Sequence, residues 1–202
     1  YPDLLRVTGL TPGHWLYKTW AALNRRALRR MGKVFTISEP MRDLLGAYRD
    51  PARIHVTPIW SIFDGSERIP RDFNDFLAET PARKDRFIVQ YSGNVGVTHH
   101  VEALLDVAER LLDDPRFLIQ IIGRGPRENA IREKARLRGL ANVELLPFQS
   151  DERFIHSLSA AHIGVVALNP LAGHASLPSK SYNLMALGIP ALYIAAPDSE
   201  LA

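Results

Sequence analysis

Residues 177–190 have the sequence Leu-Pro-Ser-Lys-Ser-Tyr-Asn-Leu-Met-Ala-Leu-Gly-Ile-Pro, which combines a loop, a helix start, a positive charge and a helix stop. Ser179 is a typical cap for free backbone amides, and Gly188 with Pro190 predicts that the helix ends about two turns later. An open helix start directs N–H groups at the space in front of it, and Lys180 adds a full positive charge there. The stretch predicts an anion site, although a short helix that only builds the fold has the same pattern.

The chain on both sides of this stretch alternates short apolar segments with helical ones. Strands are expected at 87–91, 117–122, 143–146, 163–168 and 191–194. Helices are expected at 101–112, 128–138 and 151–160. The strand at 163–168 is almost wholly apolar, which is typical of burial on both faces. This alternation predicts an α/β fold with a doubly wound parallel sheet, whose ligands bind at the carboxyl ends of the strands.

The first sixty residues predict part of a second Rossmann-like domain. Strands are expected at 34–38 and 53–58, with a helix between them that begins near Glu39 and Pro40. Residues 61–83 are rich in turn-forming residues, with one short helix expected at 73–78. The predicted domains are therefore residues 1–60, a linker at 61–83, and residues 84–202.

Positive charge is concentrated near the amino-terminal end. Residues 1–60 contain ten of the 25 Lys and Arg residues but only four of the 22 Asp and Glu residues. This local excess does not favour general nucleic-acid binding, which needs a basic face along the whole binding surface. The chain has no cysteine, which excludes disulfides and thiolate chemistry and fits a cytoplasmic location. No signal-peptide pattern occurs, and no transmembrane helix is expected.

Residues 13–31 predict an amphipathic helix that carries tryptophan and arginine but no acidic residue. Two interpretations stay open. In the more ordinary one, the Trp and Leu face packs on a sheet and the arginines are solvated. In the other, Trp15, Trp20 and the arginines at 25–30 contact anionic lipid, which gives a peripheral association at the inner face of the membrane.

Three expected loops carry glycine or positive charge, and parallel topology places all of them at one edge of the sheet. They are Gly93-Asn94-Val95-Gly96, Gly123-Arg124-Gly125-Pro126 and Ser179-Lys180. Glycine lets a backbone approach phosphate closely, while Arg124 and Lys180 can offset its charge. Each loop alone is ordinary as a turn, but together they predict a site for a phosphorylated or nucleotide ligand. Neither glycine loop matches the dinucleotide fingerprint or the Walker motif, so NAD and P-loop functions are not favoured.

The seven histidines predict no metal site, because no pair has helical spacing together with a carboxylate. His99 or His174 can instead hydrogen-bond a sugar or a phosphate. A solvent-facing histidine explains each of them equally well.

Several short motifs occur along the chain in a specific order and with specific spacing. They are Tyr-Ser-Gly-Asn-Val-Gly at 91–96, Ile-Gly-Arg-Gly-Pro at 122–126, Val-Glu-Leu-Leu-Pro-Phe at 143–148, Leu-Pro-Ser-Lys at 177–180, Tyr-Asn at 182–183 and Ala-Leu-Gly-Ile-Pro at 186–190. This order resembles the donor domain of retaining family 4 glycosyltransferases, which have the GT-B architecture. Residues 1–3, 37–41 and 58–60 resemble the end of the acceptor domain in the subgroup that builds cell-surface polysaccharides. The resemblance covers nearly the whole chain.

The resemblance implies transfer of a sugar from a nucleotide-sugar, usually a UDP-sugar, to a polysaccharide or lipid-linked glycan with retained anomeric configuration. It implies that neither a cofactor nor a metal is needed. It also assigns donor contacts: Gly93, Asn94 and Gly96 to the phosphates, Arg124 and Gly125 to the loop beneath the nucleotide, Phe148 and Gln149 to the base, Ser179 and Lys180 to the diphosphate, and Asn183 to the ribose.

Two positions depart from the family's pattern of a glutamate, seven residues and a second glutamate. The corresponding residues are Ala175 and Asn183. Asn183 can hydrogen-bond a ribose hydroxyl but cannot act as a charged base, and no catalytic residue is assigned. Two rival functions stay open: a nucleotide-sugar epimerase or hydrolase of the same architecture, and a non-catalytic nucleotide-binding subunit.

The resemblance also bears on the extent of the chain. It implies an acceptor domain that begins before Tyr1 and a donor domain that continues past Ala202. Transfer needs both domains to close on the two substrates, so this chain alone is expected to be inactive.

Overall fold

The computed structural model describes residues 2–64, 68–170, 176–197, 199 and 201. The chain divides into two compact units. The first unit consists of Tyr1–Trp60, Leu168–Pro178 and Ala195–Ala202, and the second of Ser61–Ala167 and Ser179–Ile194. Residues 61–83, the expected linker, group with the second unit. The roles predicted for the three sequence ranges stay predictions.

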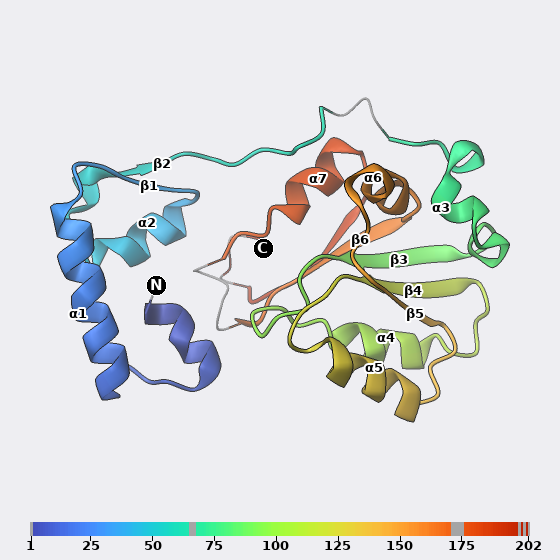
Figure 1. Cartoon of the computed structure of the whole chain (residues 1–202), viewed down its shortest axis with the longest axis horizontal. Coiled ribbons are helices and arrows are strands. Elements are labelled where there is room, and N and C mark those ends of the chain that lie inside the picture. Colours follow the sequence, from blue (N-terminus) through green and yellow to red (C-terminus); the bar gives the residue numbers. More distant parts are fainter. Residues whose placement is uncertain (1, 65–67, 171–175, 198, 200, 202) are drawn as a thin grey trace. The chain divides into compact units, whose positions relative to one another are not determined.

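The first unit contains a two-stranded parallel sheet and the helices around it (Figure 1). Its elements are η1 (Pro2–Thr8), α1 (Trp15–Arg30), β1 (Val34–Thr36), α2 (Glu39–Gly46), η2 (Pro51–Arg53) and β2 (Ile54–Val56). The Ser38 hydroxyl accepts a hydrogen bond from the Met41 amide at 3.3 Å and caps α2, which begins at Glu39 as predicted. Val34, Leu45 and Ile54 form the small core of this unit.

Helix α1 matches the predicted amphipathic segment, and its apolar face is packed only in part, because Leu28 packs against the core of Val34 and Ile54 while the tryptophans do not. Trp15 is 67% exposed and Trp20 49%, and Tyr17 is the buried residue of this helix. The physical reason is that α2 contacts both strands of the two-stranded sheet, while α1 contacts η1. The tryptophans and the helix's arginines therefore lie at the surface of the described part of the first unit.

The second unit is a five-stranded parallel sheet in the order β5-β4-β3-β6-β7. Its strands are β3 (Phe87–Ser92), β4 (Phe117–Ile122), β5 (Val143–Leu146), β6 (Ile163–Ala167) and β7 (Ala191–Ile194). Its helices are η3 (Arg71–Phe73), α3 (Asp75–Ala78), η4 (Pro81–Arg83), α4 (Ala103–Arg110), α5 (Glu128–Leu137), α6 (Asp151–Ser159) and α7 (Lys180–Ala186). The predicted α/β fold with a doubly wound parallel sheet is confirmed.

Helices cover both faces of this sheet, with α4 and α5 on one face and α3, α6 and α7 on the other (Figure 1). Alternation along the strands explains the two layers: Val89 and Tyr91 belong to the core that includes α4 and α5, whereas Ile88 packs with α3. A Cβ at Gly164 would lie 2.3 Å from Leu184 Cδ2, so α7 packs directly on β6. The core therefore fixes the helices that flank the carboxyl edge of the sheet.

A row of polar side chains crosses three strands on the α6 face. Gln90, Gln120 and Glu144 are neighbours in register. Gln90 donates to Gln120 at 3.0 Å, and Gln120 donates to Glu144 at 2.7 Å. Arg83 completes the row by pairing with Glu144 at 2.5 Å, and it donates to the Phe76 carbonyl at 2.8 Å. The row joins η4 and α3 to the sheet through a connected set of hydrogen bonds.

We expect Arg83→Met to lower the free energy of unfolding by about 3 kcal/mol, because it leaves Glu144 without its charged partner at a largely buried position. Side-chain exposure is 7% for Arg83 and 24% for Glu144. Urea unfolding followed by circular dichroism measures the change. The matched control is Arg116→Met, since Arg116 pairs with Asp114 at an exposed site. This control should unfold at the same urea concentration as the unaltered protein, and equal losses in both variants would contradict the role given to Arg83.

Candidate functional site

The loops that follow β3, β4 and β5 meet at the carboxyl edge of the sheet. The Gly93 amide donates to the Ile122 carbonyl at 2.9 Å, and the Gly123 amide donates to the Leu146 carbonyl at 3.0 Å. One step further along, the Val95 amide donates to the Arg124 carbonyl at 2.9 Å. The ladder of the sheet therefore continues into the loops, and it joins the two glycine loops predicted from the sequence.

The two glycine loops approach so closely that a side chain at Gly123 has no room. A Cβ there would lie 1.8 Å from the Gly93 carbonyl oxygen, and Gly123 has a φ of +153°. Gly125 is also tightly packed, since a Cβ added there would lie 2.4 Å from the Val95 carbonyl oxygen. Glycine is thus required for contact between the loops, before any ligand is considered.

Lys180 extends from the start of α7 to the loop after β3. Its Nζ would lie 2.9 Å from a Cβ at Gly93 and lies 3.6 Å from the centroid of the Tyr91 ring. This ammonium is buried, and it has no hydrogen-bond partner among the described residues. Burial lowers the pKa of Lys180 to about 7. Among the described residues, the site therefore contains a buried lysine amino group whose hydrogen-bonding capacity is unused.

His99 lies next to this cation. Its ring is 6.3 Å from the Tyr91 ring, measured between centroids, and its Nδ1 is 3.1 Å from the Thr98 hydroxyl oxygen. Burial, and then the charge of Lys180, lower the pKa of His99 to about 4. At neutral pH His99 is therefore uncharged and contributes no second positive charge to the site.

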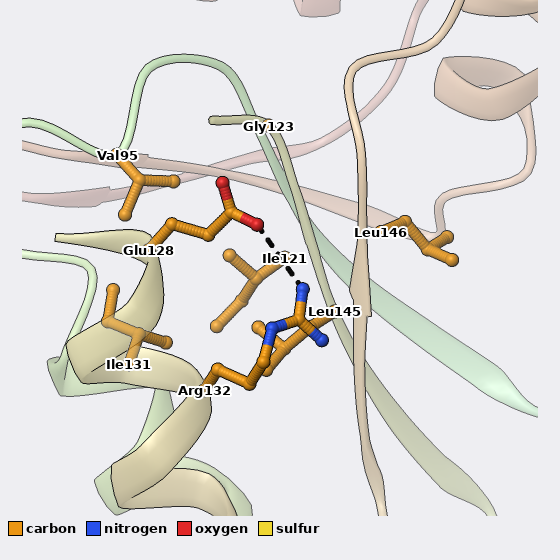
Figure 2. Close-up of a pocket in the computed structure, with 8 residues that line it drawn as sticks. All are labelled: Val95, Ile121, Gly123, Glu128, Ile131, Arg132, Leu145 and Leu146. Carbon is orange, nitrogen blue, oxygen red and sulfur yellow. Dashed lines mark hydrogen bonds and ion pairs between the residues drawn. The ribbon is translucent and has the colours of Figure 1, made fainter. Parts of the chain in front are cut away.

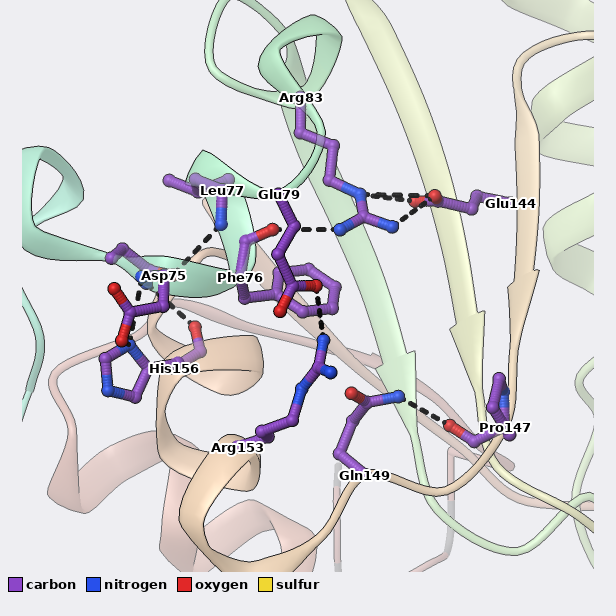
Figure 3. Close-up of polar contacts among 11 residues, drawn as sticks. Asp75, Phe76, Leu77, Glu79, Arg83, Glu144, Pro147, Gln149, Arg153 and His156 are labelled. Carbon is purple, nitrogen blue, oxygen red and sulfur yellow. Dashed lines mark hydrogen bonds and ion pairs between the residues drawn. The ribbon is translucent and has the colours of Figure 1, made fainter.

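Arg124 and Phe148 come together from neighbouring loops. The Arg124 guanidinium lies 5.6 Å from the centroid of the Phe148 ring, and Phe148 is 47% exposed. Phe148 and Gln149 also line a pocket of about 390 Å³ beside α6 and α3. Within it, Gln149 donates to the Pro147 carbonyl at 2.8 Å (Figure 3). The pocket has the size of a small-molecule site, with an exposed aromatic ring at its wall.

Charged residues brace the same pocket. Arg153 of α6 pairs with Glu79 of the segment after α3, and Arg83 pairs with Glu144 of β5 (Figure 3). These pairs connect α6 to the segment after α3, and η4 to the edge strand, so the wall that carries Phe148 and Gln149 is held by contacts on both sides.

A second, much smaller hollow lies under Gly123, between α5 and strands β4 and β5 (Figure 2). Its floor is apolar, and at its rim Glu128 and Arg132 pair at 3.3 Å. Its volume of about 10 Å³ is close to that of one water molecule, so it is a packing gap and cannot hold a nucleotide.

Ser179 does not cap α7, in contrast to the sequence-based prediction. Its backbone is helical, with φ of −59° and ψ of −21°, and its hydroxyl makes no capping hydrogen bond. A cap requires an extended backbone that turns the hydroxyl back towards the first free amides. The predicted helix stop is confirmed: Gly188 has a φ of +61°, and the Ile189 amide donates to the Leu184 carbonyl at 2.9 Å.

Asn183 contacts a segment far away in the sequence. Its Oδ1 accepts hydrogen bonds from the Ser61 hydroxyl at 2.9 Å and from the Ile62 amide at 3.3 Å. Ser61 was not among the predicted residues, because no sequence motif marks it. The ribose contact predicted for Asn183 stays a prediction.

The remaining predicted site residues fall into two groups. Asn94 and Gly96 lie in the loop after β3, where the Asn94 side-chain oxygen would be 2.8 Å from a Cβ at Gly125. His174 and Ala175 lie outside the described residues. Tyr91 was quoted only as part of a motif, although it contacts both Lys180 and the Asn94 carbonyl. Its signal was a tyrosine near the end of a strand, two residues before the first glycine of the loop.

Neither a metal site nor a membrane span is found in the described part of the chain. No cluster of three or more histidine or acidic side chains there has the geometry to hold a metal ion. No helix among the same residues is both long and apolar enough to cross a membrane.

The α/β fold with its parallel sheet matches solved structures of GT-B glycosyltransferases. The structure of HepE from Anabaena in complex with UDP-glucose matches with a TM-score of 0.73 and 15% identity, over 91% of this chain and 50% of HepE. WaaG, a glycosyltransferase involved in lipopolysaccharide biosynthesis, matches with a TM-score of 0.68 and 18% identity, over 90% of this chain and 50% of WaaG.

The chain belongs to the family Glycosyl transferases group 1, which matches residues 72–198. It is also similar to WcaI of Escherichia coli K12, named as a glycosyl transferase of colanic acid biosynthesis. The two are 28% identical over 200 residues, which is 98% of this chain and 49% of WcaI. The chain thus spans about half the length of the relatives it matches.

We expect Gly123→Ala to separate the two glycine loops, because the added Cβ would overlap the Gly93 carbonyl oxygen. The cost is about 3 kcal/mol, the upper part of the range for overpacking. Amide hydrogen exchange at Gly93 and Val95 should become faster, since these amides bond to Ile122 and Arg124, the residues on either side of Gly123. Gly32→Ala is the control, because a Cβ there meets nothing within 4 Å. Unchanged exchange at both amides would show that the loops are not held by this contact.

Proposed function

We propose that the whole protein transfers a sugar from a UDP-sugar to a polysaccharide or lipid-linked glycan acceptor with retention of the anomeric configuration. The observation that carries the proposal is the buried, unpartnered Lys180 ammonium beside Gly93, at the sheet edge where family members of this fold can receive a nucleotide. Family membership supports a transferase. The UDP-glucose complex of HepE supports the donor class, and the similarity to WcaI supports a glycan acceptor.

The proposed roles follow the chemistry of each group. Lys180 and Arg124 neutralise the diphosphate from two loops, and the backbone at Gly93 approaches it closely. The exposed Phe148 ring supplies a flat apolar surface for the base, and Gln149 is adjacent to it. Because these two cations can offset the charge of the diphosphate, we also propose that the transfer needs neither a metal nor a cofactor.

Product analysis separates this proposal from its rivals. The whole protein is incubated with a labelled UDP-sugar, with and without a lipid-linked acceptor. The expected product is a glycoside that forms only when the acceptor is present. NMR should show that it has the same anomeric configuration as the donor. A changed sugar on UDP without acceptor would indicate an epimerase, free sugar a hydrolase, and tight binding without turnover a binding subunit.

We expect Lys180→Met to weaken UDP binding by about tenfold to a hundredfold, since a charge-assisted hydrogen bond to phosphate contributes about 1.5–3 kcal/mol. Methionine keeps the apolar stem that packs beside Gly93. Titration calorimetry at pH 7 measures the affinity. Lys134→Met in the last turn of α5 is the control and should bind UDP normally. Equal affinity in Lys180→Met and the control would remove Lys180 from the site.

The stability of Lys180→Met gives an internal check. The pKa of Lys180 is lowered to about 7 in the folded protein from an ordinary value of 10.5, so the neutral form is favoured by folding. The cost of burying the charge is fully present below pH 7 and is lost as the pH rises to 10.5. Lys180→Met should therefore be no less stable than the unaltered protein at pH 6, and its relative advantage should disappear above pH 10.

We also propose that α1 attaches the protein peripherally to anionic membrane. Trp15 and Trp20 are exposed, and Arg29 and Arg30 occupy the last turn of a helix whose first turn has no acidic residue. Each basic residue near an anionic surface contributes about 1 kcal/mol.

Charge reversal of the arginines at 25, 26, 29 and 30 should abolish flotation with phosphatidylglycerol vesicles at low salt. Charge reversal of Arg132 and Arg136 on α5 is the control and should leave flotation unchanged. Flotation that persists after the α1 arginines are reversed would show that α1 does not bind the membrane.

A further inference from the structure

Tyr91 joins two parts of the candidate site that come from different elements. Its side chain is fully buried near the end of β3. Its hydroxyl donates to the Asn94 carbonyl at 2.6 Å, and the face of its ring lies 3.6 Å from Lys180 Nζ. One residue therefore contacts both the loop after β3 and the cation at the start of α7.

Each of the two contacts uses a different chemical property of Tyr91. Burial raises the pKa of the Tyr91 phenol, so the hydroxyl stays protonated and acts as a donor to the loop. The face of an aromatic ring is electron-rich and attracts an ammonium, most strongly where water is excluded. The ring therefore favours the charged form of Lys180, which burial alone disfavours.

Other groups around the ammonium do not provide this stabilisation. The titratable side chains that face it are Tyr91 of β3 and His99 of the following loop, and the low pKa of His99 leaves the imidazole neutral. No carboxylate of the described residues pairs with Lys180, and no acceptor bonds to its Nζ. Within this part of the chain, the Tyr91 ring is the group that offsets the cost of burying the charge.

The placement of Lys180 is unusual for a lysine. Long basic side chains normally cover apolar surface with their stems and keep the charged head in water. Here the head is buried and the ring lies under it, in a position that Gly93 leaves open. An ammonium held this way keeps its hydrogen-bond donors free for an incoming anion.

We propose that Tyr91 is a positioning residue for anion binding: its ring favours the charged form of Lys180 and holds the side chain in place beside Gly93, and its hydroxyl fixes the loop at Asn94. The identity of the anion as the diphosphate of a nucleotide rests on the proposed function. The two contacts predict separable effects, because a phenylalanine keeps the ring and loses only the hydroxyl.

The test compares Tyr91→Phe and Tyr91→Leu in the whole protein. Lysine NMR measures the titration midpoint of Lys180 without ligand, and calorimetry measures UDP affinity from pH 6 to pH 9. Tyr91→Phe should keep the midpoint and lose about fivefold in affinity at every pH, as expected for one hydrogen bond. Tyr91→Leu should lower the midpoint by about one pH unit and lose about tenfold to thirtyfold in affinity at pH 7.5, with recovery towards pH 6. Tyr17→Phe, which loses a hydroxyl bond to Asp3, is the control and should change neither quantity.

A midpoint that is the same in Tyr91→Leu and the unaltered protein would overturn the proposal, whatever happens to stability. If Tyr91→Leu does not fold, fluorinated phenylalanines at position 91 keep the shape and weaken the ring's negative face. The midpoint should then fall stepwise with fluorination, and a constant midpoint is the contrary result. Absence of UDP binding by the unaltered protein contradicts the proposed function, while the ligand-free titration still decides the role of Tyr91.

Discussion

The direct contact between two loop backbones is the constraint on which the candidate site depends. Gly123 and Gly93 come together because neither has a side chain, and the hydrogen bonds of the sheet extend through them. Parallel strands end at one edge, so the loops after β3 and β4 are neighbours by topology. Contact at the backbone level removes the freedom that such loops usually have. Arg124 and Asn94 are therefore presented from a rigid frame.

Burial of the Lys180 charge is the second organising interaction. An isolated ammonium inside a protein is costly, and the fall in its pKa to about 7 expresses that cost. The Tyr91 ring offsets part of it, and an anionic ligand would offset much more. The folded protein thus carries an electrostatic disadvantage that the charge of a bound phosphate would relieve. Functional sites commonly hold such destabilising groups, because rigid surroundings keep them in place.

The other wall of the site depends on the polar row across the sheet. Arg83 and Glu144 hold η4 against the edge strand, and Arg153 joins α6 to the segment after α3. The segment with Phe148 runs between these anchors. At the opposite side, Asn183 receives hydrogen bonds from residues 61 and 62, so the helix that begins at Lys180 is tied to the segment that precedes the sheet. The hydrogen bonds that stabilise the second unit therefore also hold the residues of the candidate site.

The sequence by itself determined the elements, the parallel sheet and the edge at which the loops gather. Apolar runs such as 163–168 specify strands buried on both faces, and Gly188 with Pro190 stops α7, because these signals are local and act through backbone geometry. Only the tertiary structure decided that the Ser179 hydroxyl does not cap α7, that Asn183 bonds to Ser61, and that the Tyr91 ring contacts the Lys180 amino group. Those contacts join residues up to 122 positions apart, and they depend on packing distances that no local pattern encodes.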